Sequence, residues 1–127
     1  VSENKYIQYT VDGEDYIYKV FAVFFDYNYN LDLRHNGDYT EEEMNEYLKY
    51  VNNLNVYDFD VEVDSTDKII TLTTCTRMFG QYEKKQIAVV ARQLRKDEKM
   101  NNYESKANEK YDEIKKKNPQ VKFPLAI

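Results

Sequence analysis

The sequence predicts a mainly β fold with helices, and three observations support this class. Asp12-Gly13 separates two strand-like runs and is a dipeptide typical of tight hairpin turns. Residues 57–63 alternate between apolar and acidic side chains, and residues 69–74 are rich in β-branched side chains. Helical periodicity is confined to residues 40–51 and to a tail segment near the C-terminus. We therefore expect a β domain that carries two helices.

The first expected element is a hairpin whose arms meet at Asp12-Gly13. Its second arm, 16–25, ends in a nearly continuous apolar run, which is typical of a strand covered on both faces. The polar residues 26–38 then predict a loop. Their acidic side chains resemble a calcium loop, but Leu31 stands where the turn needs Gly and Gly37 where a bidentate Glu is required. We therefore expect no metal here.

Residues 40–51 give the strongest helix pattern. Thr40 can cap the helix, and Glu43, three residues later, completes a capping box. Asn52 and Asn53 are expected to end it. The stripe expected to face the core consists of Met44, Tyr47, Leu48 and Val51.

A second strand pair is expected over 57–75. Residues 57–63 would form one arm, 64–67 the turn and 69–74 the other arm, so that Cys75 falls at the end of a strand. A loop, 76–85, and a further strand, 86–94, would follow.

The tail is expected to be helical over 101–118, and Pro119 would end the helix. The side chains expected on one side of that helix are Tyr103, Ala107, Tyr111 and Ile114. We expect residues 1–95 to form the β domain, and 96–127 to add this helix and a short apolar end.

Composition excludes several classes of function. The net charge of −5 argues against nucleic-acid binding, which usually needs a basic surface. One cysteine excludes an internal disulfide framework and a zinc site built from several thiolates. No apolar run approaches the ~20 residues that span a bilayer.

Cys75 has two readings. A lone cysteine is most often buried as a small apolar side chain. At a strand end, however, a thiol can reach a cleft. Arg77, Lys84 and Lys85 in and after the following loop would favour its thiolate form.

A five-residue motif, followed by a loop and the strand IAVVARQL, resembles the end of a sortase domain. The motif, Thr-Leu-X-Thr-Cys in sortases, is matched by Thr71, Leu72, Thr73, Thr74 and Cys75. A helix before the cysteine-bearing strand is similar to class B sortases in particular. The resemblance covers roughly residues 5–95.

The resemblance implies a sortase-like β-barrel and a cysteine transpeptidase with Cys75 as nucleophile. Such enzymes cleave a sorting signal in a secreted protein and join that protein to an amine of a cell-wall precursor or of a pilin. Thr73, Thr74 and Arg77 would contact the substrate, and 40–51 and 76–85 would wall the groove. No cofactor is implied. The location would be the outer surface of a Gram-positive cell, with an N-terminal membrane anchor lying outside this sequence.

The sequence departs from the family at two catalytic positions. The family His lies upstream of the first hairpin, and His35 here falls in a polar loop instead. We therefore expect a chain truncated before that His, a barrel incomplete at its N-terminus, and self-association through the exposed core. Gln86 stands at the family Arg position, and Arg92 is ~20 Å further along an extended strand.

These departures lead us to expect that this chain alone is inactive. They also keep two alternatives open. The chain could be a non-catalytic sortase-fold domain that binds or supports other proteins. It could also be an unrelated β-rich domain in which Cys75 is buried.

Overall fold

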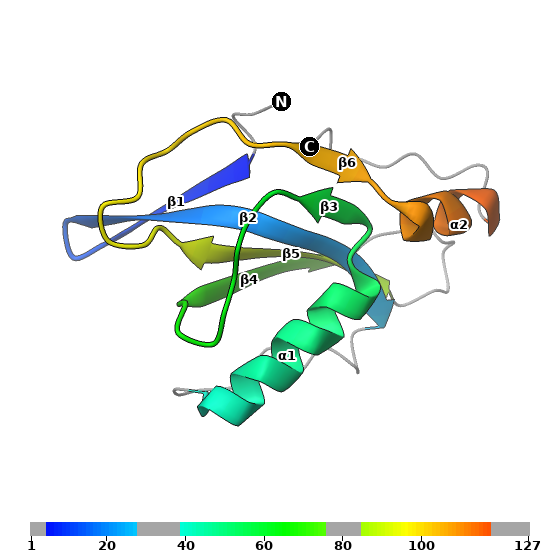
Figure 1. Cartoon of the computed structure of the whole chain (residues 1–127), viewed down its shortest axis with the longest axis horizontal. Coiled ribbons are helices and arrows are strands. Elements are labelled where there is room, and N and C mark those ends of the chain that lie inside the picture. The colour runs from blue at the N-terminus through cyan, green and yellow to red at the C-terminus, as the bar shows by residue number, and fades with distance from the viewer. Residues whose placement is uncertain (1–4, 28–38, 76–84, 118–127) are drawn as a thin grey trace.

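The computed structural model describes residues 5–27, 39–75 and 85–117. Figure 1 shows a curled, open sheet with α1 packed across it and a smaller β3–β6 pair beside α2. The elements in chain order are β1 (Tyr6–Val11), β2 (Glu14–Tyr27), α1 (Glu41–Leu54), β3 (Tyr57–Phe59), β4 (Ile69–Cys75), β5 (Lys85–Gln93), β6 (Ser105–Ala107) and α2 (Glu109–Lys117). The predicted mainly β fold with two helices is confirmed. None of the described helices is long and apolar enough to cross a membrane.

The larger sheet has the strand order β1-β2-β5-β4, and every neighbouring pair is antiparallel. β1 and β2 form the predicted hairpin, with Val11 opposite Glu14. Asp12 and Gly13 have φ values of 52° and 79°, the left-handed conformation that a two-residue hairpin turn requires. The Asp-Gly signal in the sequence is therefore confirmed as a turn.

Two apolar clusters cover opposite faces of the central strands. On one face, α1 contributes Val51 to a cluster with Ala22, Phe24, Ala88 and Val90. On the other face, the segment that enters β3 packs on the sheet, and this cluster contains Val20, Val23, Phe25, Val56, Tyr57, Ile87 and Ala91. The continuous apolar run of β2 is explained by this double coverage, as the sequence predicted.

The capping box predicted for α1 is present. The Glu43 N–H donates to Thr40 Oγ1 at 3.1 Å, and the Thr40 N–H donates to Glu43 Oε1 at 3.1 Å. The helix extends to Leu54, past the predicted end at Asn52 and Asn53, and Asn55 caps it instead. The Asn55 side chain accepts from the Val23 N–H at 3.0 Å, which ties this helix end to β2 beside the irregularity between Val20 and Ala22.

The predicted pairing of 57–63 with 69–74 is wrong. Only Tyr57–Phe59 forms a strand, and it pairs with β6 rather than with β4. The chain then crosses the sheet, where Arg92 Nε donates to the Glu62 carbonyl at 2.7 Å. The alternation of half-buried and exposed side chains and the turn at 64–67 are both present, and the Asp67 N–H donates to the Asp64 carbonyl at 3.1 Å.

The helix predicted over 101–118 is shorter, because the segment before it is extended. Tyr103 is buried, and its hydroxyl lies 2.7 Å from the carbonyl oxygens of both Lys5 and Val20. These contacts anchor the segment against the first hairpin. The helix begins only after Asn108, whose side chain accepts from the Lys110 N–H at 3.0 Å and caps it.

Candidate active site

The end of β4 meets the start of β5 at one end of the larger sheet. β4 ends at Cys75, and in the antiparallel ladder Cys75 lies directly opposite Gln86. Residues paired in this way have Cα atoms about 4.5–5.5 Å apart. The structure therefore makes Gln86, which the sequence resemblance aligns with the family arginine, the cross-strand neighbour of Cys75.

The same row continues onto β2, where Asp26 lies opposite Gln86. The Tyr50 hydroxyl from α1 donates a hydrogen bond to Asp26 Oδ2. Burial raises the pKa of Tyr50 above its ordinary value, and the bond to Asp26 raises it further. Tyr50 thus stays a neutral donor at neutral pH and links α1 to the row that contains Cys75.

Aromatic side chains of α1, and Tyr39 two residues before it, flank the approach to this row. The rings of Tyr39 and Tyr47 stack with their centroids 5.9 Å apart, and the ring centroids of Tyr47 and Tyr50 are 6.3 Å apart. The Tyr47 and Thr71 hydroxyls are 2.8 Å apart and share a hydrogen bond. Burial raises the pKa of Tyr47, although this bond lowers it in part. α1 therefore borders β4 along the strand that leads to Cys75.

Sequence reasoning placed Tyr47 in the apolar stripe and did not identify Asp26 or Tyr50 as site residues. The available signal for the tyrosines was their spacing of three residues on the core-facing side of the helix, which brings two hydroxyls to one helix face. Asp26 gave no such signal, because its neighbour Gln86 is sixty residues away and only the strand register brings them together.

The structure describes the other predicted site residues to different extents. Thr73 is exposed on β4, opposite Ala88. For Thr74 and Cys75 the structure describes the backbone, which completes the strand. Arg77 and His35 lie outside the described residues, as does most of the loop 76–85.

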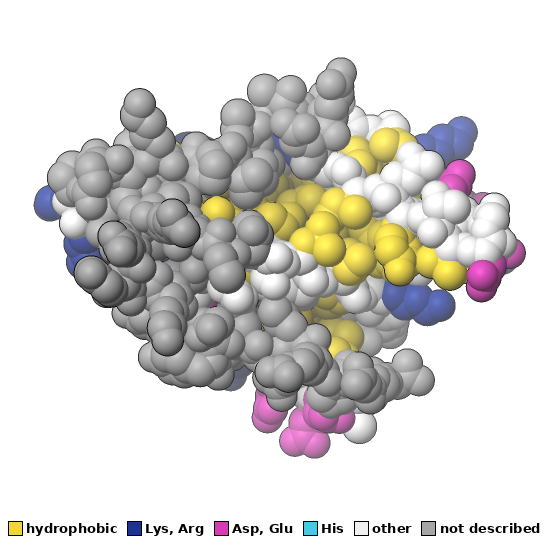
Figure 2. All heavy atoms as spheres, turned by 180° about the vertical axis from the view of Figure 1, so that it is seen from behind, with side chains coloured by type: hydrophobic (Ala, Val, Ile, Leu, Met, Phe, Trp, Pro, Cys, Tyr) yellow, Lys and Arg dark blue, Asp and Glu magenta, His cyan; other side chains and the backbone are white. Residues whose placement is uncertain are grey.

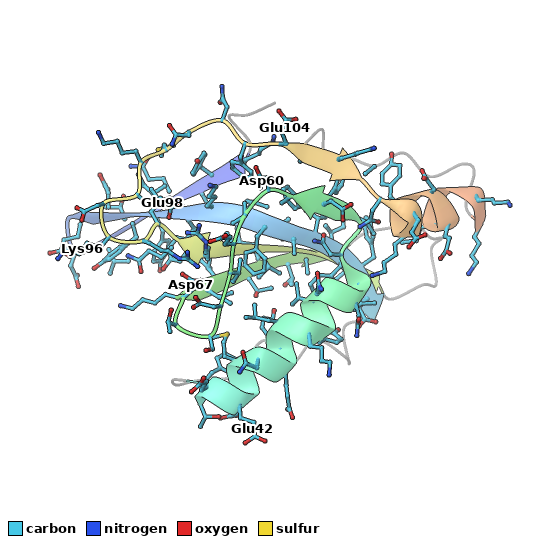
Figure 3. All side chains as sticks on the ribbon, viewed as in Figure 1. Glu42, Asp60, Asp67, Lys96, Glu98 and Glu104 are labelled. Atoms are coloured by element: carbon cyan, nitrogen blue, oxygen red, sulfur yellow. The ribbon has the colours of Figure 1, made fainter. Side chains whose placement is uncertain are left out.

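Arg92 lies at the far end of β5, opposite Ile69 rather than Cys75. Its guanidinium donates two hydrogen bonds to the Glu98 carboxylate, at 2.7 and 2.9 Å. Figure 3 shows Glu98 and Asp67 in this end of the molecule. Arg92 is thus engaged in an ion pair remote from the Cys75 row.

Metal chemistry has no ready ligand set in this part of the chain. Within residues 5–27, 39–75 and 85–117, no group of three or more His, Cys, Asp and Glu side chains is arranged to hold an ion.

Comparison with solved structures identifies the fold. Sortase B from Clostridium perfringens superposes with a TM-score of 0.62 and 24% identity, covering 72% of this chain and 49% of that chain. The Staphylococcus aureus sortase B–substrate complex gives 0.59 and 23%, covering 72% of this chain and 41% of that one. Sortase B from the type II pilus of Streptococcus pneumoniae gives 0.60 and 20%, with 70% and 49% coverage.

The chain has the sortase B fold. Its open, curled sheet fits part of a sortase β-barrel, and the chain spans about half the length, or less, of these sortase B structures. A further similar structure is a sortase B complexed with triglycine. No protein-family model matches the sequence, and a search of curated proteins gives no match. The predicted resemblance to class B sortases is therefore confirmed at the level of the fold.

Proposed function

We propose that this chain contains the nucleophile-bearing part of a sortase-type cysteine transpeptidase, with Cys75 as the nucleophile. The observation that carries the proposal is the register that sets Cys75, at the end of β4, opposite Gln86 within a sortase B fold. A nucleophile at a strand end can meet a peptide lying along the sheet. A neighbouring side chain with N–H donors can face the oxyanion that forms there.

The proposed reaction has two halves. The Cys75 thiolate attacks a peptide carbonyl and forms a C–S bond, the C–N bond breaks, and the leaving amine takes a proton from solvent, which gives a thioester. A second amine then attacks the thioester carbonyl, the C–S bond breaks as a new amide forms, the amine proton passes to solvent, and the thiolate is released. In this scheme the Gln86 amide donates to the oxyanion. Gln86 carries no charge, so its stabilisation is weaker than that of an arginine.

We propose a sorting-signal peptide of a secreted protein as the acyl donor, and an amine of a cell-wall precursor or pilin as the acceptor. The similar structures support these classes in general terms, because one holds a substrate and another holds triglycine. Thr73, Thr74 and Arg77 are the proposed peptide contacts. The proposed location is the outer cell surface, with a membrane anchor in a segment outside this sequence.

A second candidate is a non-catalytic sortase-fold domain. Gln86 opposite Cys75 favours it, because the resemblance calls for a permanent positive charge at that place. The sequence also has one histidine, His35, outside the described residues. We therefore propose that this chain alone does not turn over a sorting peptide.

Alkylation separates these functions, because Cys75 is the only thiol. A nucleophilic Cys75 reacts with iodoacetamide faster than free cysteine at mildly acidic pH, and mass spectrometry then finds one adduct. Reaction at the rate of a free thiol supports the non-catalytic domain. Reaction only after unfolding refutes the transpeptidase function, since it places Cys75 in a sealed core, and leaves only the non-catalytic domain.

We also propose self-association. Figure 2 shows a band of apolar side chains on the side of the molecule opposite to the view of Figure 1. Exposed apolar residues include Tyr9 at 51%, Val11 at 38% and Leu72 at 45%. Burying such surface favours association. Sedimentation equilibrium that shows only monomer across micromolar concentrations would refute this proposal.

A further inference from the structure

A cleft borders the face of α1 that carries Asn45, Leu48, Lys49 and Asn52. It has a volume of about 620 Å³ and opens between α1 and the segment that crosses the sheet after β3. In Figure 1 this segment passes in front of β2 on its way from β3 to β4. The apolar part of the lining consists of Phe21, Ala22, Leu48, Val51, Phe59, Val61 and Val63. The cleft shares none of these residues with the Cys75 row.

Along the crossing segment, apolar side chains alternate with carboxylates. Phe59, Val61 and Val63 are half-buried and line it. The residues between and beside them are exposed carboxylates: Asp58, Asp60, Glu62 and Asp64. An apolar floor is thus bordered by a negatively charged rim along one segment of chain, which bends at Asp60.

Charge on this rim is only partly compensated. Arg95 lies 3.6 Å from Asp64 and 3.8 Å from Glu62. Lys49, from α1, lines the opposite wall of the cleft. Arg95 is also shared with Asp67, at 2.9 Å, and Lys106 lies opposite Asp58 in the β3–β6 pair. Five carboxylates against these three cations leave an excess of two negative charges, which attracts a cationic partner.

The backbone of the segment can also bind. The Glu62 carbonyl is used, because it accepts from Arg92 at 2.7 Å and Arg95 at 3.3 Å. The Val61 N–H is also used, because it donates to the Phe59 carbonyl at 2.9 Å. By contrast, among the described residues nothing hydrogen-bonds to the Val63 N–H, the Val63 carbonyl or the Val61 carbonyl. Free groups of alternate residues on an extended segment are what an added peptide strand pairs with.

We propose that this cleft is a second peptide-binding groove, which takes an extended segment with small apolar side chains alternating with Lys or Arg. The apolar side chains would enter the cleft and the cationic ones would meet the acidic rim. The peptide backbone would pair with Val61 and Val63. The inference goes beyond the proposed transpeptidase function and does not depend on Cys75.

Fluorescence anisotropy with a labelled peptide of about eight alternating Lys and Val residues tests the groove. We expect saturable binding that weakens as salt is raised. A peptide of alternating Glu and Val, and one with the same Lys and Val residues in two separate blocks, should bind at least about tenfold more weakly. Equal binding of all three peptides would overturn the proposal.

Two substitutions test whether the peptide binds in the cleft. Val61→Lys puts a cation on the cleft wall and should weaken binding at least about tenfold. Leu72→Lys is the matched control, because Leu72 is an exposed apolar residue of β4 outside the cleft, and it should leave binding unchanged. Equal weakening by both variants would overturn the groove.

Glu62→Lys keeps the test decisive if Val61→Lys fails to fold, since the Glu62 side chain is 94% exposed. It should weaken binding several-fold, and unchanged binding would count against the proposal.

A second copy of the chain is the other occupant to consider. Self-association that is lost in Val61→Lys but kept in Leu72→Lys would assign the cleft to a dimer and overturn the peptide proposal.

Discussion

The two ends of β5 carry side chains of different chemistry and different use. At one end Arg92 is 2% exposed and is bound through two hydrogen bonds to Glu98. At the other end the neutral amide of Gln86 lies opposite Cys75 and Asp26. The buried arginine of this strand is therefore committed to holding the fold, while the residue directly opposite Cys75 is uncharged. One end of β5 thus stabilises the fold, and the other end forms part of the candidate chemical site.

Removing the cation should have the largest effect. Arg92→Ala leaves the Glu98 carboxylate with the ion pair to Lys19, at 3.7 Å, and leaves the Glu62 carbonyl with the longer hydrogen bond from Arg95, at 3.3 Å. We expect a loss of about 3–5 kcal/mol in the free energy of unfolding, measured by urea denaturation.

The control for this prediction is the Arg92→Met, Glu98→Met double variant. It should cost less than Arg92→Ala, because no unpaired carboxylate remains. A loss below about 1 kcal/mol for Arg92→Ala would show that the pair contributes little, and that the two ends of β5 do not differ as described.

Acid should weaken the same end of the sheet. The hydrogen bonds from Arg92, and then that from the Arg95 N–H, lower the pKa of Glu98 from 4.5 to about 2. The unfolded chain therefore binds this proton at higher pH than the folded chain. The stabilisation is complete above pH about 4.5 and is lost as the pH falls towards 2, with a total of about 2 kcal/mol after solvent screening.

Unfolding free energies measured at steps of pH between about 6 and 2 check this slope. In Glu98→Gln the part of the slope due to this carboxyl should disappear. If the variant keeps the full slope of the parent protein, other carboxyls cause the acid sensitivity.

The fold was largely predictable because its strongest signals are local. Asp12-Gly13 determines a turn by its own backbone preferences, and the Thr40–Glu43 box begins a helix within four residues. The failures are both non-local. The acidic-apolar pattern of 57–63 predicts extended chain but contains nothing that selects β6 over β4 as its partner. Tyr103 looked like a helix position because its spacing to Ala107 and Tyr111 is helical, whereas its buried hydroxyl bonds keep that segment extended.

The candidate site was predictable only where a motif covered it. The Thr71–Cys75 match and the alignment of the next strand pointed to Cys75 and Gln86. Asp26 and Tyr50 complete the row through a register and a helix–strand contact that no short motif encodes. Their roles depend on tertiary packing, and single-sequence patterns do not report it.

Tyr50→Phe tests how the Cys75 end is held. The substitution keeps the ring, which packs edge-on against Phe24 at 5.7 Å, and removes the hydroxyl that donates to Asp26. Because Asp26 is half-buried, we expect a loss of about 1–2 kcal/mol in the free energy of unfolding. The loss should be smaller than for Arg92→Ala, because the group removed here is a neutral hydroxyl and not a buried cation. Tyr16→Phe, at a hydroxyl that bonds only the exposed Glu14, is the control and should cost less than about 0.5 kcal/mol.

Gln86→Arg gives the smallest expected effect and addresses the difference between the two ends most directly. It places a cation opposite Cys75, as Arg92 lies opposite Ile69, and a nearby positive charge favours the thiolate. We expect the pH midpoint for alkylation of Cys75 to fall by about half a unit to one unit, because Asp26, on the other side of the row, will attract part of the new charge. Gln8→Arg, on the exposed part of β1, carries the same charge change at a distance and should leave the midpoint unchanged. If both variants lower the midpoint equally, the effect is one of net charge. The cross-strand position of Gln86 would then have no special influence on the thiol.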